Sequence, residues 1–306
     1  MHLAFLGFGL IAGSVARAVR SNPLTADWHI VAWSPSGDGP RQAVADGVVD
    51  TAMSAPEEVL AGAEIVVLAA PATSCLALID RLAGPWRGLL PDLAVVTDVA
   101  STKTSIMARA DAAGLHFVGG HPMAGLEAAG YSAASPDLFI DRPWVVVPGT
   151  LARPSDLRRV AELAEACSAV IVSMDAVTHD RAVAGISHLP MILAAALVES
   201  VAGRRDEQVD QAEPAAGGTD RTAGEWPIAA ALAAGGWRDM TRLARGDPAM
   251  GAAIAATNAA ALAARLRELQ AVLDLWLDQL DRPDGPDETA VRARLAAARE
   301  ILERPT

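Results

Sequence analysis

Short apolar runs alternate with alanine-rich stretches in the first half of the chain. Each run is bounded by Gly, Pro, Asp or Ser, and the runs span residues 2–7, 29–33, 65–69, 94–99, 117–120 and 144–148. Such runs are typical of buried strands, whereas the stretches between them are typical of helices. The alternation predicts βαβ units and therefore an α/β domain with a doubly wound parallel sheet over residues 1–149.

The second half of the chain has a different pattern. After residue 148 the strand-like runs largely stop, and Ala, Leu and Arg recur at helical spacing. We expect helices over residues 155–168, 178–201, 249–280 and 286–302, and a mobile loop over the polar, glycine-containing residues 203–224. Residues 150–306 are therefore predicted to form an all-helical domain that binds substrate and packs in a homodimer.

Composition and charge narrow the classes of partner. The chain has 306 residues and a formal net charge of −12, so it lacks the basic surface that nucleic acids and anionic membranes require. The apolar stretch 182–198 is short for a membrane span and contains His188 and Pro190. Cys75 and Cys167 lie far apart without a Cys/His cluster, which argues against a disulfide framework and a zinc site. We expect a soluble cytoplasmic protein without a bound metal.

Three small residues follow the first predicted strand. Gly7, Gly9 and Ala12 match the spacing G-x-G-x-x-[GA] between a strand and a helix. The first glycine permits a tight turn, the second lets the backbone approach a pyrophosphate, and the third residue allows close helix–strand packing. The turn predicts a Rossmann-type dinucleotide site with the phosphates at the helix N-terminus, although such a turn can also exist without a ligand.

The end of the second predicted strand bears on the choice between NAD and NADP. NAD-specific domains usually place a carboxylate there for the ribose 2′-hydroxyl, but this chain has Trp33-Ser34-Pro35-Ser36. These serines, with Arg41 nearby, could accept a 2′-phosphate, so NAD(P) is expected with NADP slightly favoured; Arg41 could equally be a solvated helix residue. We expect the cofactor to contact Gly7, Gly9, Leu10, Ile11, Ser34, Ser36, Arg41, Ala70 and Pro71.

Further segments make the sequence more specific than a dinucleotide turn alone. In chain order they are Gly9-Leu10-Ile11-Ala12-Gly13-Ser14, Thr97-Asp98-Val99-Ala100-Ser101-Thr102-Lys103, Gly120-His121-Pro122-Met123-Ala124-Gly125, Ile186-Ser187-His188-Leu189-Pro190 and Gly235-Gly236-Trp237-Arg238-Asp239-Met240-Thr241-Arg242. In this combination the chain resembles the prephenate/arogenate dehydrogenases of tyrosine biosynthesis, over both predicted domains to about residue 258. The resemblance implies that a small-molecule substrate, prephenate or arogenate, is oxidised at its ring hydroxyl. Hydride passes to NAD(P)+, and the ring carboxylate is lost as CO2.

Such a reaction needs a base near the hydroxyl and a donor that orients it. His121 follows the strand 117–120 at the carboxyl edge of the sheet, and the resemblance implies that it is the base. Ser101 is expected to bridge His121 and the substrate hydroxyl, to cap the next helix, or both. Asp98 and Lys103 are left outside the site, because an acidic strand end and a first-turn lysine are often only a turn and a solvated side chain.

The carboxylates of the substrate need partners in the second domain. A guanidinium can hold a carboxylate with two parallel hydrogen bonds, and the resemblance implies that Arg238 holds the ring carboxylate. The alternative for Arg238 is an ion pair with Asp239. His188, with Ser187 beside it, matches a family histidine that lines the substrate pocket, and its alternative role is at a helix start.

One position departs from the pattern of many prephenate-preferring relatives. Three residues after His188 those relatives have a second histidine, whereas this chain has Met191. A thioether cannot donate a charged hydrogen bond to a pyruvyl side chain, so arogenate, whose side chain carries an ammonium group, is a plausible substrate. Glu127 is a candidate partner for that ammonium or, equally, an exposed turn carboxylate.

Other functions remain open at this point. A relative in specialised metabolism that acts on an amino-substituted prephenate would have nearly the same motifs. A β-hydroxyacid or imine-type dehydrogenase generally needs a lysine or aspartate in the helical domain, but Lys103 is the only lysine of the chain. A nucleotide-sensing Rossmann protein would have no need of His121, Ser101 and Arg238 together. No room is expected for a regulatory ACT-type domain, so tyrosine could inhibit only by competition.

Overall fold

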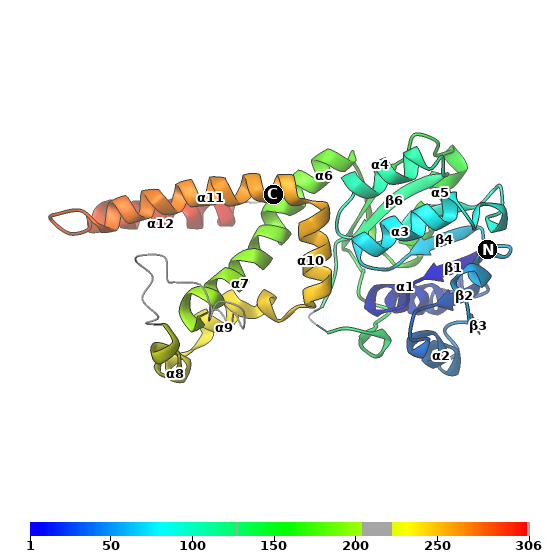
Figure 1. Ribbon diagram of the computed structural model, residues 1–306, viewed down its shortest axis with the longest axis horizontal. Coiled ribbons are helices and arrows are strands. Elements are labelled where there is room, and N and C mark those ends of the chain that lie inside the picture. The colour runs from blue at the N-terminus through cyan, green and yellow to red at the C-terminus, as the bar shows by residue number, and fades with distance from the viewer. Residues whose placement is uncertain (127, 204–221, 305–306) are drawn as a thin grey trace, which may run out of the picture. The chain divides into compact units, whose positions relative to one another are not determined.

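The computed structural model describes residues 1–126, 128–203 and 222–304 (Figure 1). The chain forms two compact units, Met1–Ala259 and Ala260–Thr306. The first unit contains the sheet and all the predicted catalytic, substrate-binding and cofactor-binding residues. Glu127 and most of the predicted loop 203–224 lie outside the described residues.

A single mostly parallel sheet forms the centre of the first unit, with the strand order β3-β2-β1-β4-β5-β6-β7-β8. Only the pairing of β6 with β7 is antiparallel among the paired strands. The strands are β1 (His2–Leu6), β2 (His29–Trp33), β3 (Thr51–Ala52), β4 (Ile65–Leu68), β5 (Val95–Asp98), β6 (Phe117–Pro122), β7 (Pro143–Pro148) and β8 (Val170–Ser173). The chain first builds outward from β1 to β3 and then continues from β4 on the other side of β1. Such a reversal places a crevice at the carboxyl ends of the strands.

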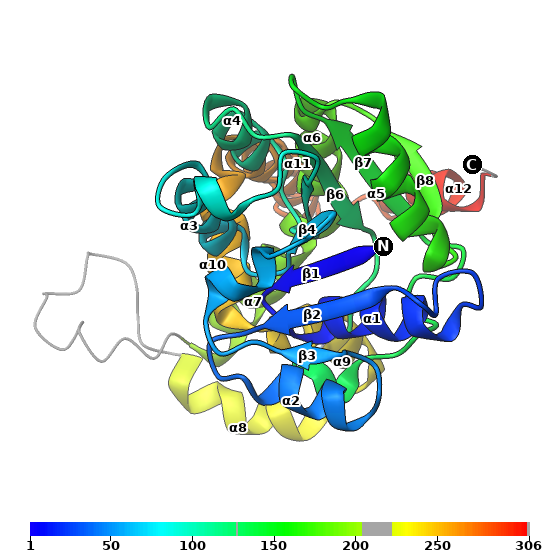
Figure 2. The same cartoon turned by 90° about the vertical axis from the view of Figure 1, so that its right-hand side faces the viewer.

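Apolar side chains point alternately to the two faces of this sheet. On β1, Leu3 and Phe5 join one core cluster, while Ala4 and Leu6 join the other. The first cluster is covered by α1 (Leu10–Ser21), α2 (Asp38–Ala45) and α5 (Pro154–Ala166), and the second by α3 (Ala72–Ala83) and α4 (Thr104–Ala112) (Figure 2). The expected doubly wound α/β fold is confirmed, because helices pack on both faces.

All six expected strands are present, but the sheet contains two more. The strand β3 has only two residues, and β8 is an edge strand whose side chains are mostly exposed. Neither has the long buried run that makes a strand visible in a sequence. The sheet therefore continues to Ser173, beyond the predicted domain boundary at residue 149.

The expected helix 178–201 is part of a longer helical segment. It comprises α6 (Ala176–Val183), a π-helical turn (Ala184–His188) and α7 (Leu189–Ala202). Pro190 has no N–H to donate to the carbonyl of Ile186, so the wider turn forms just before it. Together these elements span 27 residues and are long and apolar enough to cross a membrane, with 22% of the most apolar window buried. The expectation that this stretch is too short for a span is therefore wrong.

The remaining helices of the first unit are α8 (Thr222–Leu232), α9 (Gly235–Thr241) and α10 (Pro248–Thr257), with short 3-10 turns elsewhere in the chain. The expected helix 249–280 is interrupted at Asn258, which separates α10 from α11 (Ala259–Leu280). In the second unit, α12 (Glu288–Glu303) packs against α11, because Arg294 lies 4.1 Å from the ring centre of Trp276 and donates to the Val272 carbonyl.

A buried ion pair lies where β5 ends. The Lys103 ammonium donates to the Asp98 carboxylate, and both side chains are completely buried. The same carboxylate accepts the backbone N–H groups of Ala100 at 3.0 Å and Gly120 at 3.1 Å. It thereby connects β5 to β6 one residue before His121. Lys103 is thus not the solvated side chain considered above, because Asp98 replaces the water that the ammonium loses.

We expect Lys103→Met to lower the free energy of unfolding by about 3–5 kcal/mol, because it leaves the Asp98 carboxylate buried without a counter-ion. Urea denaturation measures this change. The matched control is Arg109→Met on α4, which breaks an ion pair with Asp80 whose side chains are 48% and 54% exposed. That exposed pair should contribute at most about 1 kcal/mol. Equal losses in the two variants would contradict the structural role of Lys103.

Candidate active site

A pocket of about 460 Å³ lies at the carboxyl ends of β1, β2 and β4. Its size is within the range of small-molecule sites. The lining residues are Gly7, Phe8, Gly9, Trp33, Ser34, Pro35, Ser36, Ala69, Ala70, Pro71, Ser74, Ala77, Leu78 and Arg81. Most of the predicted cofactor residues are therefore brought together here, whereas Leu10, Ile11 and Arg41 are not among the lining residues.

The glycine turn of this pocket has the features that a pyrophosphate requires. Gly7 has a φ of +94°, and a Cβ there would lie 2.3 Å from the Ala69 carbonyl oxygen, so only glycine can occupy the position. A Cβ on Gly9 would meet no atom within 4 Å, so the space on that side is open. Gly9 is also the N-cap of α1 and provides no capping side chain. The first-turn N–H groups of α1 are thus left for a phosphate.

The expected arginine at the ribose end of this pocket has another role. Arg41 donates to the Asp38 carboxylate at 2.7 Å and to the Ser36 carbonyl at 3.1 Å. Arg41 is therefore a solvated residue of α2, the alternative role considered above, and its side chain does not line the pocket. Arg81 of α3, which the sequence did not single out, lines the pocket instead.

A chain of hydrogen bonds leads from His121 into the helical part of the first unit. His121, on β6, is 8% exposed, and its Nδ1 lies 2.8 Å from His179 Nε2. His179 Nδ1 lies 2.8 Å from Asp180 Oδ1, and both of these residues are on α6. The carboxylate of Asp180 also accepts the backbone N–H groups of Lys103 at 2.7 Å and Thr104 at 2.8 Å. Asp180 therefore caps the N-terminus of α4.

This chain of contacts determines where the imidazole protons are. Burial alone would raise the pKa of Asp180, but hydrogen bonds from His179 and Thr104 hold it below its usual value. An ionised carboxylate only accepts hydrogen bonds, so His179 Nδ1 carries the proton that faces Asp180. His179 Nε2 is then an acceptor, and His121 Nδ1 donates to it. The lone pair of His121 is left on Nε2, which has no partner among the described residues.

Electrostatics keep His121 in its neutral form. Burial and the nearby Lys103 ammonium lower the pKa of His121 well below 6.5. At neutral pH the Nε2 atom is therefore free to accept a proton, as a general base requires.

Ser101 and His188 lie next to each other at this edge. Helix α4 begins at Thr104 with Lys103 as its N-cap, so Ser101 does not have the capping role considered above. Its hydroxyl has no hydrogen-bond partner in the described part of the chain, and the bridge to His121 stays a prediction. Burial lowers the pKa of His188 to about 4, whereas the Asp180 carboxylate and the Ser101 backbone oppose this shift.

His188 is oriented by Asn258, the residue that interrupts the predicted helix 249–280. The Asn258 amide donates to the backbone carbonyl of Asp180 at 2.9 Å, and its nitrogen lies 3.2 Å from His188 Nδ1. An amide nitrogen is only a donor, so His188 accepts at Nδ1 and carries its proton on Nε2. That Nε2 group is buried, and the Ser101 backbone is one neighbour that favours the protonated form of His188. Ser187, by contrast, is exposed.

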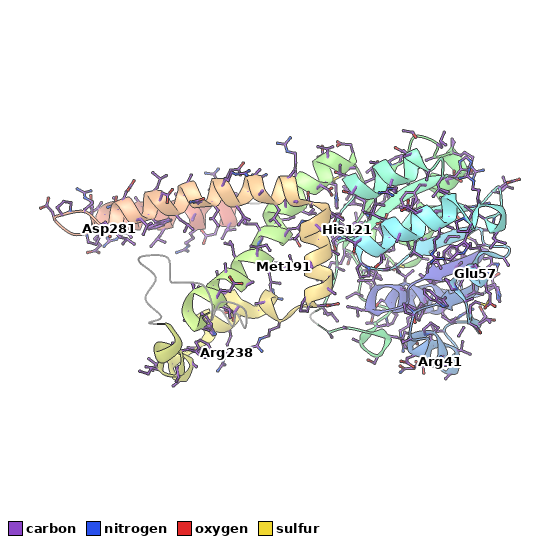
Figure 3. All side chains as sticks on the ribbon, in the orientation of Figure 1. Arg41, Glu57, His121, Met191, Arg238 and Asp281 are labelled. Atoms are coloured by element: carbon purple, nitrogen blue, oxygen red, sulfur yellow. The ribbon has the colours of Figure 1, made fainter. Side chains whose placement is uncertain are left out.

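The structure does not bring Arg238 to His121. Arg238 lies on α9, which packs against α7, and its side chain is exposed. Figure 3 shows Arg238 well away from His121, with Met191 of α7 between them. Asp239 is exposed as well, and no ion pair joins it to Arg238 within the described residues. The expected crevice shared by His121 and Arg238 is thus not formed within one chain.

Several residues of this site were not recognised in the sequence. His179 and Asp180 form the relay, Asn258 orients His188, and Arg81 lines the cofactor pocket. One further residue could have been noticed in the sequence. Lys103 is the only lysine in a chain whose other basic residues are arginines, and it lies two positions after Ser101. Histidines and aspartates in a helix start, such as Thr178-His179-Asp180, have no distinguishing pattern.

Comparison with known proteins links this geometry to one family. Residues 15–173 match the family model of the nucleotide-binding domain of prephenate dehydrogenase, and residues 175–283 match that of its dimerization domain. A prephenate dehydrogenase of Bacillus subtilis is 30% identical over 279 residues, which cover 90% of this chain and 67% of the relative.

Solved structures show the same fold. An arogenate dehydrogenase of Synechocystis is 29% identical and superimposes with a TM-score of 0.75, with 99% of this chain and 100% of that chain covered. A prephenate dehydrogenase of A. aeolicus, in complex with hydroxyphenyl propionate and NAD+, superimposes with a TM-score of 0.81 at 22% identity over 99% and 98% of the two chains. The expected resemblance is therefore confirmed by sequence and by fold.

Proposed function

This chain belongs to the prephenate dehydrogenase family, and from that membership we propose that it oxidises prephenate or arogenate in tyrosine biosynthesis. Bound NAD(P)+ supplies the acceptor for the hydride that leaves the ring carbon bearing the hydroxyl group. The C–C bond to the ring carboxylate then breaks, CO2 leaves, and the bonding electrons make the ring aromatic. The protein has to accept the hydroxyl proton and hold the ring in place.

The arrangement of His121 carries this proposal. Its Nε2 lone pair lies at the carboxyl edge of the sheet that also forms the glycine turn, and it is kept free by the His179–Asp180 relay. Its lowered pKa keeps it neutral at physiological pH, so it can accept the hydroxyl proton. In this proposal Ser101, next to His188, orients the hydroxyl group.

The proposed cofactor preference is NADP+ over NAD+. No carboxylate is present among the residues that line the described pocket, so nothing there accepts a hydrogen bond from a 2′-hydroxyl as an acidic residue would. Ser34 and Ser36 offer hydroxyl donors at the same place. Use of a nicotinamide dinucleotide is a property of the family, and the choice between the two forms is our proposal.

The proposed substrate is arogenate rather than prephenate. Met191 packs against α10, where a Cβ on Gly251 would lie 3.4 Å from its sulfur atom. The thioether therefore occupies a tight apolar contact and supplies no charged donor for a keto acid side chain. An amino-substituted prephenate is the second candidate, because it would meet the same apolar position.

We expect reduced cofactor, followed at 340 nm, to form faster with arogenate than with prephenate. Met191→His should raise kcat/KM for prephenate relative to arogenate by about tenfold, which corresponds to one charge-assisted hydrogen bond. Met250→His, at an exposed position of α10, is the control and should leave the ratio unchanged. Absence of reduced cofactor with prephenate, arogenate and the amino analogue alike would refute the proposed function.

The base assignment predicts both a rate loss and a pH profile. His121→Asn should lower kcat by about 10²- to 10⁴-fold without changing cofactor affinity, because no group accepts the hydroxyl proton.

In the unmodified protein, kcat/KM should fall only below about pH 6.5, since protonation of His121 removes its lone pair. His179→Leu removes the acceptor that holds the Nδ1 proton of His121, so this variant should also lower kcat, because the base is no longer held in the correct tautomer and orientation. His116→Leu, at a half-exposed position away from the relay, is the control. A kcat of His121→Asn near that of the original protein would exclude this base.

The proposed oligomer is a homodimer in which Arg238 serves the neighbouring subunit. The second matched domain is described as a dimerization domain, and large apolar side chains are exposed on the helical segment, including Ile186 (73%), Ile228 (67%) and Leu232 (77%). A second copy on this surface would cover them and explain why Arg238 is remote from His121 in its own chain. Arg238 would then hold the ring carboxylate in the partner's crevice.

Subunit complementation tests this arrangement. His121→Asn and Arg238→Ala should each be nearly inactive alone. After subunits of the two variants are mixed and allowed to exchange, about a quarter of the original activity should return, because half of the dimers are mixed and each mixed dimer has one intact site. If Arg238 acts within its own chain, no mixed dimer has an intact site and the mixture stays inactive.

The proposed surroundings are those of a cytoplasmic enzyme with a small-molecule substrate. Cys75 and Cys167 are both free and buried, which suits a reducing compartment. We propose that a second copy, rather than lipid or nucleic acid, covers the apolar helices, in keeping with the net charge of −12.

A further inference from the structure

One face of α3 forms a wall of the cofactor pocket. Pro71, Ser74, Leu78 and Arg81 all line the pocket and follow each other at three- or four-residue spacing, which places them on one side of the helix. The opposite part of the lining comes from Trp33, Ser34, Pro35 and Ser36 at the end of β2. The pyrophosphate turn lies at Gly7 and Gly9. The last turn of α3 and the end of β2 are therefore the part of the pocket that would hold the adenosine half of a dinucleotide.

Arg81 is the only charged residue among those that line the described pocket. Its guanidinium carbon lies 5.3 Å from the ring centre of Trp86, which is 5% exposed and gives the arginine a fixed support. Within the described residues, Arg81 forms no ion pair, whereas Arg41 is paired with Asp38 and Arg109 with Asp80. The Arg81 donors are thus available to an anion.

Ser34 supplies a second unused donor in the same pocket. The residue is 9% exposed and lines the pocket, yet its hydroxyl has no hydrogen-bond partner in the part of the chain that the structure describes. Its hydroxyl is therefore available to a ligand in the pocket. The Ser36 oxygen accepts the backbone N–H of Asp38 at 3.2 Å, which holds this side chain near the start of α2.

We infer that Arg81 and Ser34 form a subsite for the 2′-phosphate of NADP+, and that Arg81 rather than Arg41 determines the cofactor preference. The inference rests on the proposed use of a nicotinamide dinucleotide. A 2′-phosphate carries nearly two negative charges and accepts several hydrogen bonds, which a guanidinium and a hydroxyl can donate. NAD+ has only a 2′-hydroxyl at this position, which offers no negative charge to the guanidinium.

Binding of adenosine fragments tests this subsite without the cyclohexadienol substrate. Isothermal titration of the full chain with 2′,5′-ADP and with 5′-AMP compares ligands that differ only in the 2′-phosphate. The unmodified protein should bind 2′,5′-ADP more tightly. Arg81→Ala should reduce that advantage by about 10- to 100-fold, the loss of charge-assisted hydrogen bonds, and leave 5′-AMP nearly unchanged. Ser34→Ala should act in the same direction, with a smaller effect.

Two controls make the result specific. Arg87→Ala removes an exposed arginine just after α3 that donates to the carbonyls of Ala113 and Gly114, and it should leave both ligands unaffected. Arg41→Ala should change the preference by less than about threefold, because Arg41 is not among the residues that line the pocket.

Two outcomes of the titrations would contradict the Arg81 subsite. If Arg81→Ala weakens 2′,5′-ADP and 5′-AMP equally, the guanidinium stacks on the adenine and the inference is wrong. If Arg41→Ala abolishes the preference and Arg81→Ala does not, the specificity lies on α2. Because no turnover is measured, a wrong substrate assignment would leave this outcome unaffected.

Discussion

Lys103 connects the two buried carboxylates on which the active-site edge depends. Its ammonium is paired with Asp98, and its backbone N–H donates to Asp180. A charge removed from water has to be compensated inside the protein, so these partners cannot separate without a large cost in free energy. Through Asp98 the pair holds Gly120 of β6, and through Asp180 it holds α6 against the N-terminus of α4. His121 follows directly after the first of these contacts and is oriented by the second.

The same network explains how a histidine in this position can act as a base. The positive end of the α4 dipole and two backbone N–H groups stabilise ionised Asp180, so His179 has only one proton arrangement available. His121 must then present its lone pair outward. A neighbouring ammonium that lowers the pKa of the base weakens its proton affinity, but it also ensures that the base is unprotonated before the substrate binds.

The helical segment that carries His188 has two functions: it positions this histidine in the active site, and it presents an apolar surface. The π-helical turn accommodates Pro190 and brings His188 beside Ser101, while Asn258 ends α10 where its amide reaches both His188 and the Asp180 carbonyl. The apolar remainder of α7 is for the most part only half-buried in a single chain. In the proposed dimer, the second subunit would cover the apolar surface, and Arg238 would reach the active site of that subunit. Dimer formation would therefore complete the site.

The sequence by itself determined the features that depend on local pattern. Six strands, the glycine turn, His121 after its strand and the family were all recognisable, because each depends on residue types at short, regular spacing. The tertiary structure alone decided the rest. His121 and His179 are 58 positions apart, Lys103 and Asp180 are 77 apart, and His188 and Asn258 are 70 apart. No periodicity relates such residues, and Lys103 and Arg81 look like ordinary surface cations until the fold buries one and turns the other toward the pocket. Burial and hydrogen-bond partners, which give these side chains their chemistry, exist only after distant segments have packed.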